Sequence, residues 1–162
     1  MIAAVNVKKW KGLIFWVLAT LAVGVLSSLA GGDVRTVYDA LVKPAFAPPA
    51  WVFPVVWTGL YVLLGFAAYL IWSAGVKQPG VREALFYYVL NLIANFFWLP
   101  IFFRWQMVWF ALVWLGMMLI LAAILAVQFY RINRGAGVIV LLYLLWLLYA
   151  FALNGSIAWL NG

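Results

Sequence analysis

The chain contains no cysteine and no histidine. The absence of cysteine excludes disulfide bonds, thiolate-held iron–sulfur clusters and thiolate catalysis. The absence of histidine removes the commonest metal ligand and the commonest proton shuttle, and with them histidine-ligated haem proteins and zinc proteases. We therefore expect neither a metal site nor a required cofactor.

Charged residues are also scarce. They make up 8% of the 162 residues and only three are acidic, whereas 70% of the chain is apolar. A soluble domain is about a quarter charged and about half apolar. The composition therefore excludes a soluble enzyme, a disordered chain and a nucleic-acid-binding domain. A mean hydropathy of +1.16 indicates instead that the lipid bilayer is the main solvent.

The apolar residues fall into five runs, each long enough for a helix that crosses a bilayer, at about 20 residues per span. The first run has a basic start like a signal peptide, but it is longer than a typical signal core and no small-residue cleavage site follows. We interpret it as a retained helix. The runs are continuously apolar, which excludes a transmembrane barrel of alternating strands. The sequence predicts one all-α domain over 1–162, a bundle of five transmembrane helices at about 10–30, 51–72, 82–103, 106–130 and 136–160.

Residues 31–50 differ in character, because they are rich in glycine, proline and charged residues. We expect a long first loop there, with a short helix around Thr36–Val42. Loops of this length in compact domains are often functional lids. The sequence therefore predicts a candidate pocket lid.

The basic residues are unequally shared between the two sides. One side carries seven, namely Lys8, Lys9, Lys11, Lys77, Arg82, Arg131 and Arg134, and the other carries Arg35, Lys43 and Arg104. Basic loops stay in the cytoplasm. We expect an integral protein of a prokaryotic cell membrane, with the N-terminus cytoplasmic and the C-terminus outside.

The middle of each predicted span lacks ionisable residues, which argues against a proton-coupled pump. Aromatic residues instead make up 19% of the chain. Polar and aromatic residues recur on single helix faces, which are Asn91–Asn95–Trp98, Trp57–Tyr61 and Trp146–Ala150–Asn154. A cavity lined by such groups suits a large flat apolar ligand with a few polar atoms.

Each of these patterns also has a purely structural interpretation. Asparagines in spanning helices commonly hydrogen-bond to a neighbouring helix, and a small-residue face such as Gly24 and Ser28 favours close packing. Tryptophans near span ends serve as interfacial anchors. Tryptophans inside spans fit these interpretations less well, because a buried indole N–H needs a partner.

The segment Pro48–Tyr61, followed by Gly65, resembles the translocator protein family, which is also called the tryptophan-rich sensory protein or peripheral-type benzodiazepine receptor family. Residues 38–44 look like the first-loop motif of that family. Residues 90–103, 106–109 and 143–154 are similar to segments of its third, fourth and fifth helices. The resemblance runs in order through nearly all of the chain.

This resemblance implies a five-helix bundle, often a homodimer, that binds porphyrins such as protoporphyrin and other flat apolar ligands between its helices. With the helix-face patterns, it gives twelve candidate ligand-binding residues. They are Ser28, Tyr38, Trp51, Phe53, Trp57, Tyr61, Asn91, Asn95, Trp98, Trp109, Trp146 and Ala150. Trp57 and Trp146 also match the tryptophans implicated in light-dependent porphyrin degradation in some bacterial members.

Four positions depart from the family pattern: Val37 and Phe46 replace loop tryptophans, Val113 replaces an acidic residue, and Leu142 replaces a proline. The family's C-terminal sterol motif needs a tyrosine and a basic residue, and Gly155–Gly162 contains neither. We therefore do not expect sterol binding through that motif.

The leading hypothesis is a membrane protein that binds porphyrin-like ligands and senses, transports or regulates tetrapyrroles, with Arg35 or Lys43 as cations for the propionates. One alternative is an enzyme that degrades porphyrin in light through Trp57 and Trp146. Another is a facilitated transporter or a regulatory protein that binds a partner. A homodimer through small residues such as Gly116, Ala122 and Ala126 would suit any of these functions.

Overall fold

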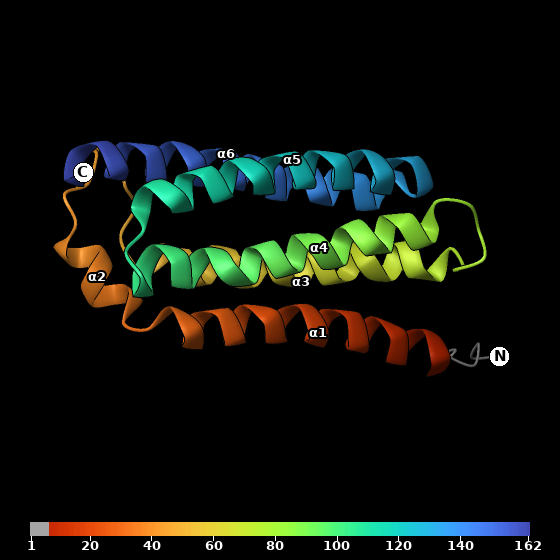
Figure 1. Cartoon of the computed structure of the whole chain (residues 1–162). Coiled ribbons are helices and arrows are strands. Elements are labelled where there is room, and N and C mark those ends of the chain that lie inside the picture. The colour runs from red at the N-terminus through yellow and green to blue at the C-terminus, as the bar shows by residue number, and fades with distance from the viewer. Residues whose placement is uncertain (1–6) are drawn as a thin grey trace.

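Five long helices lie side by side in a bundle (Figure 1). This computed structural model describes residues 7–162. All five helices are long and apolar enough to cross a membrane, which confirms the predicted fold class. The long helices are α1 (Val7–Gly31), α3 (Val52–Ser73), α4 (Val81–Leu99), α5 (Val108–Ile132) and α6 (Arg134–Asn161).

The connections between the helices give the bundle two different ends (Figure 1). The start of α1, the α3–α4 connection and the α5–α6 turn lie at one end, which we call the N-terminal end. The long segment between α1 and α3 lies at the other end together with the C-terminus, and we call this the loop end. The candidate lid is therefore confined to one end of the molecule.

The predicted third span is not a single regular helix. It is α-helical as α4 to Leu99 and continues as a π-helical turn, η1 (Pro100–Arg104). Pro100 has no backbone N–H, so it cannot donate to the carbonyl of Phe96 one turn earlier. The wider turn is closed instead by the N–H of Trp105, which donates to the oxygen of Pro100 at 2.9 Å. The turn places the side chains that follow Pro100 in the interior of the loop end.

The carbonyl that Pro100 leaves free is used by α1. The Oγ of Ser27 donates to the oxygen of Phe96 at 2.8 Å, and Ser27 is buried whereas Ser28 is exposed. The prediction that Ser28 faces the interior is therefore wrong by one residue, which is about 100° of rotation around a helix. Gly24 does pack closely, because a Cβ at this position would lie 2.5 Å from the ring of Tyr61.

The small residues of α5 serve the packing of the bundle itself. Ala122 is fully buried and Ala126 is 5% exposed in the single chain, on the side of α5 that packs against its neighbours. These two alanines are therefore not available to a second copy, which corrects the predicted dimer surface.

The long connection contains a short helix, α2 (Val34–Ala40), which begins two residues before the predicted one. Its start is set by Asp33, whose side chain accepts a hydrogen bond from the N–H of Thr36 at 3.1 Å. This bonding to Thr36 holds the pKa of Asp33 below its ordinary value. The end of α2 is capped by Lys43, whose Nζ donates to three backbone oxygens of residues 38–41.

The loop is attached to α6 at two points. The side-chain amide of Asn161 accepts from the N–H of Val42 and donates to its carbonyl, both at 2.9 Å. The hydroxyl of Tyr149 donates to the oxygen of Phe46 at 3.1 Å. These contacts hold residues 42–46 against the C-terminal half of α6 and close the loop end.

Candidate functional site

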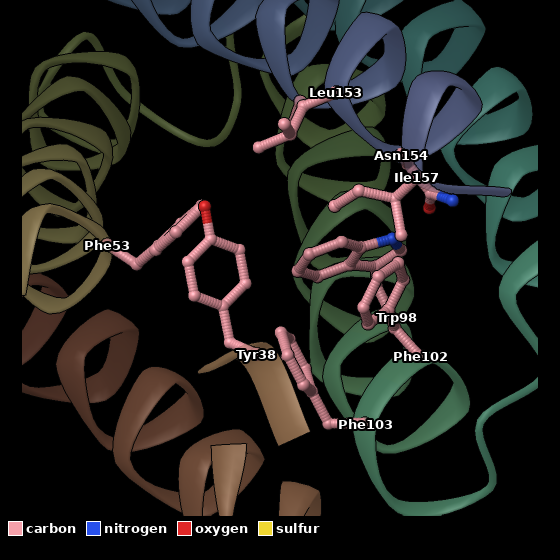
Figure 2. A pocket seen from close by; sticks show the side chains of 9 residues that line it. Tyr38, Phe53, Trp98, Phe102, Phe103, Leu153, Asn154 and Ile157 are labelled. Atoms are coloured by element: carbon pink, nitrogen blue, oxygen red, sulfur yellow. The ribbon is translucent and has the colours of Figure 1, made fainter. Parts of the chain in front are cut away.

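A small cavity lies under the loop, between α2, α3, α4, η1 and α6 (Figure 2). Its volume is about 20 Å³, which is room for about one water molecule. The residues that line it are Tyr38, Phe53, Trp98, Phe102, Phe103, Ala150, Leu153, Asn154 and Ile157. We call this the central cavity.

Aromatic rings form most of the wall of the central cavity. The rings of Tyr38 and Phe53 meet edge to face with centroids 5.0 Å apart, on the side of α2 and α3. Opposite them, the ring of Trp98 lies 5.5 Å from Phe102 and 6.1 Å from Phe103 (Figure 2). Rings of this kind present broad apolar faces, which can stack on a flat ligand.

Tyr38 closes the cavity from the loop side. Its side chain is 3% exposed, and its hydroxyl donates to the oxygen of Pro48 at 2.7 Å. The ammonium group of Lys43 lies 5.0 Å from the centre of the ring. Burial raises the pKa of Tyr38 to about 12, so the hydroxyl keeps its proton and remains a donor at neutral pH.

Two of the residues that line the cavity carry a buried polar atom that has no hydrogen-bond partner. The two atoms are the indole Nε1 of Trp98, a donor, and the Oδ1 of Asn154, an acceptor. The amide nitrogen of Asn154 is already used, because it donates to the oxygen of Val108 at 3.0 Å. A buried polar group without a partner costs about 1–3 kcal/mol. A ligand that supplies one acceptor and one donor would remove that cost.

A second buried group, which we call the amide cluster, joins α4 to α6. The Nδ2 of Asn95 donates to the hydroxyl of Tyr143 at 2.7 Å and to the Oδ1 of Asn91 at 2.9 Å. The hydroxyl of Tyr143 in turn donates to the same Oδ1 at 2.8 Å. The structure therefore favours the interhelical interpretation of these two asparagines over direct contact with a ligand in the central cavity.

Further aromatic residues connect the amide cluster to the loop. Trp57 lies 5.5 Å from Tyr61 and 6.4 Å from Tyr143, measured between ring centroids. Trp146 lies 6.4 Å from Phe53 and 5.2 Å from Tyr149, and its Nε1 has no partner. An aromatic interior thus extends from the central cavity along the contact between α3 and α6.

The twelve predicted residues fall into three groups. Four line the central cavity: Tyr38, Phe53, Trp98 and Ala150. Five pack in the interior beside it: Trp57, Tyr61, Asn91, Asn95 and Trp146. The other three are exposed and do not line the cavity: Ser28, Trp51 and Trp109.

The exposed positions have simple structural causes. Trp51 lies at the start of α3 and is 67% exposed. Trp109 is 53% exposed in the first turn of α5, where its indole faces Gly162 at the C-terminus. Ser28 lies one residue beyond the position that faces α4.

Five lining residues were absent from the predicted set. Phe102 and Phe103 enter the site through the π-helical turn, which sequence periodicity does not reveal. Asn154 lies on the predicted face Trp146–Ala150–Asn154 but was not among the twelve candidates. Leu153 and Ile157 follow Ala150 at i+3 and i+7, so the same helix periodicity would have found them.

Comparisons with known proteins identify the family of the chain. The sequence profile of the TspO/MBR family matches residues 16–160. The tryptophan-rich protein TspO of Archaeoglobus fulgidus is 37% identical over 150 residues, which cover 92% of this chain and 96% of that protein. The tryptophan-rich sensory protein of Cereibacter sphaeroides is 36% identical, covering 76% of each chain. The human translocator protein is 33% identical, covering 86% of this chain and 83% of its own length. The chain, a five-helix membrane protein, therefore belongs to the TspO/MBR family.

Proposed function

We propose that this protein binds porphyrin-like tetrapyrroles and other flat apolar ligands in the central cavity, and thereby senses, transports or regulates them. The observation that carries the proposal is the pair of unpartnered buried atoms, Trp98 Nε1 and Asn154 Oδ1, on two residues that line a cavity of aromatic and aliphatic side chains. A free-base porphyrin has pyrrole N–H groups that suit the acceptor and carboxylates that suit the donor.

Binding requires the loop to move. A site for a drug-sized ligand has about 300–1,000 Å³, whereas the central cavity has about 20 Å³. The rings of Tyr38 and Phe53 fill the side nearest the loop, and residues 42–46 are held by the contacts of Asn161 and Tyr149. Each hydrogen bond contributes about 0.5–1.5 kcal/mol, so opening is within reach of a ligand's binding energy.

Burial and stacking would supply most of the affinity. The chain has no histidine or cysteine for axial ligation, and apolar contact yields about 25 cal/mol per Å² before ordering costs. Lys43 is a weaker partner for the propionates than expected, because its ammonium already donates to three backbone oxygens. Arg35 is highly exposed and pairs only loosely with Asp39 at 3.9 Å, so it is the better candidate.

The proposal is tested by filling the cavity. Ala150 lines the central cavity, whereas Ala152 is exposed on the same helix. We expect saturable quenching of tryptophan fluorescence by metal-free protoporphyrin in detergent, weakened at least tenfold in Ala150→Phe and unchanged in Ala152→Phe. Equal quenching of all three proteins without saturation would mean partition into the micelle and would contradict the proposal.

A second candidate function is light-dependent degradation of a bound porphyrin. The indoles of Trp57 and Trp146 each pack on a tyrosine, at 5.5 and 5.2 Å between centroids. Each indole would donate an electron to the photo-excited porphyrin, with dioxygen as the final oxidant. Trp57→Phe is expected to bind porphyrin normally and to bleach it more slowly, and an unchanged bleaching rate would exclude this role.

The placement in the membrane follows from charge. The N-terminal end carries six net positive charges and the loop end one, which favours a cytoplasmic N-terminal end. The central cavity would then open toward the outside, and the C-terminus would lie there too.

Any transport would be uncoupled, because the spans carry no ionisable side chain in their middle. A homodimer would use other surfaces than Ala122 and Ala126, because both are buried in the single chain.

A further inference from the structure

A groove lies at the N-terminal end of the bundle, far from the central cavity. It is formed by α1 and the last turn of α3, and its volume is about 380 Å³. The lining residues are Lys11, Gly12, Phe15, Trp16 and Trp72. Figure 1 shows the start of α1 and the end of α3 at the end opposite α2. The groove is thus a second site with its own walls.

Three of the five residues that line the groove are aromatic, and two of these pack closely against other parts of the protein. A Cβ at Gly12 would lie 2.6 Å from the ring of Trp72, so only glycine lets this ring lie against the backbone of α1. Trp16 is held edge-on between Phe15, at 5.7 Å, and Tyr88, at 5.8 Å. Phe15 is 63% exposed and Trp72 is 38% exposed, so the apolar walls are open to the surrounding lipid.

A cation without a counter-ion stands at the groove. Among residues 7–162 the one ion pair joins Arg35 to Asp39, at the loop end. At the N-terminal end the single acidic residue, Glu83, accepts a hydrogen bond from Gln128 at 3.2 Å. The ammonium of Lys11 therefore lies beside an apolar groove, in the half of the molecule that carries almost all of the net positive charge.

We propose that this groove binds one anionic phospholipid from the leaflet at the N-terminal end. The headgroup phosphate would pair with Lys11, and an acyl chain would lie against Phe15, Trp16 and Trp72. A lysine near a membrane surface attracts anionic lipid, while the aromatic rings provide contact that a bare anion cannot use. A zwitterionic lipid would fit the walls but would gain no net charge attraction. This site is independent of ligand binding in the central cavity.

The test uses the tryptophans of the groove as reporters. The protein is reconstituted in phosphatidylcholine vesicles that contain a small fraction of lipid with brominated chains, either phosphatidylglycerol or phosphatidylcholine. Bromine quenches an indole that it touches. We expect stronger quenching by brominated phosphatidylglycerol, and a loss of about fivefold in that preference in Lys11→Gln, which corresponds to ~1 kcal/mol for one lysine.

Three controls decide the outcome. Arg131→Gln removes a charge at the same end but outside the groove and is expected to keep the preference. The double variant Trp16→Phe, Trp72→Phe keeps apolar walls and is expected to lose the excess quenching. Inorganic phosphate at constant ionic strength is expected to leave the preference in place. The proposal would be overturned if both lipids quench equally, or if Arg131→Gln has the same effect as Lys11→Gln. It would also be overturned if the excess quenching survives in the double variant, or if phosphate removes the preference.

Discussion

The Oγ of Ser27 donates a hydrogen bond to the carbonyl oxygen of Phe96 at 2.8 Å, and this is the oxygen that Pro100 leaves without a helical partner. One contact thus joins α1 to α4 just before the π-helical turn. The π-helical turn brings Phe102 and Phe103 to the central cavity. The first helix is therefore coupled to the shape of the site without lining it.

Removing this hydroxyl is expected to destabilise the bundle. Ser27→Ala leaves the Phe96 oxygen without a partner inside the protein, at a cost of about 1–3 kcal/mol. Ser28→Ala changes an exposed side chain and is expected to have almost no effect. Thermal or denaturant unfolding in one detergent would measure both variants. If the two variants unfold alike, the contact with Phe96 does not contribute to stability.

Loosening the loop is expected to change the rates of ligand binding. Asn161→Ala removes both hydrogen bonds to Val42. The free energy of the closed state should therefore rise by about 1–3 kcal/mol relative to the open state. Association and dissociation of protoporphyrin, followed by stopped-flow fluorescence, should then both become faster by at least fivefold.

The matched control for the loop is Ser156→Ala. Ser156 is on the same helix and bonds only to the oxygen of Ala152 within it. The rates of protoporphyrin association and dissociation in Ser156→Ala should equal those of the wild type. Unchanged rates in Asn161→Ala would show that ligand entry does not require this part of the loop to open.

The closed loop is expected to lose stability in alkaline solution. Burial raises the pKa of Tyr38 from 10.0 to about 12, so the folded form holds the proton more tightly than the unfolded form. The stabilisation is complete below pH 10 and falls as the pH rises toward about 12. Tyrosinate absorbance of the wild type minus that of Tyr38→Phe reports this titration. A difference spectrum that titrates at the ordinary value would show that the ring is not buried in solution.

The absence of cysteine allows a direct measurement of orientation. Arg35→Cys places one thiol on the loop end, and Lys77→Cys places one on the connection between α3 and α4. We expect a membrane-impermeant maleimide to label Arg35→Cys in intact cells and Lys77→Cys only after lysis, because the more basic end stays inside. The opposite labelling pattern would place the N-terminus outside.

Several features follow directly from the sequence, because they are local. Uninterrupted apolar length determines the five spans, since a helix satisfies its own backbone hydrogen bonds in lipid. Asp33 fixes the start of α2 through its own side chain. The motif at Pro48–Tyr61 is enough to identify the family, which the comparisons confirm.

Other features were decided only when the helices packed together. Ser27 rather than Ser28 faces α4, because a single residue turns a helical side chain by about 100°. Asn91 and Asn95 bond to Tyr143, and Asn154 bonds to the oxygen of Val108, while each of the three keeps one side-chain polar atom without a partner. Partners for a buried polar atom come from other helices, so neither spacing nor composition reveals them. The sequence by itself therefore determined the spans and the family, while the tertiary contacts decided which side chains line the cavity and where the loop lies against α6.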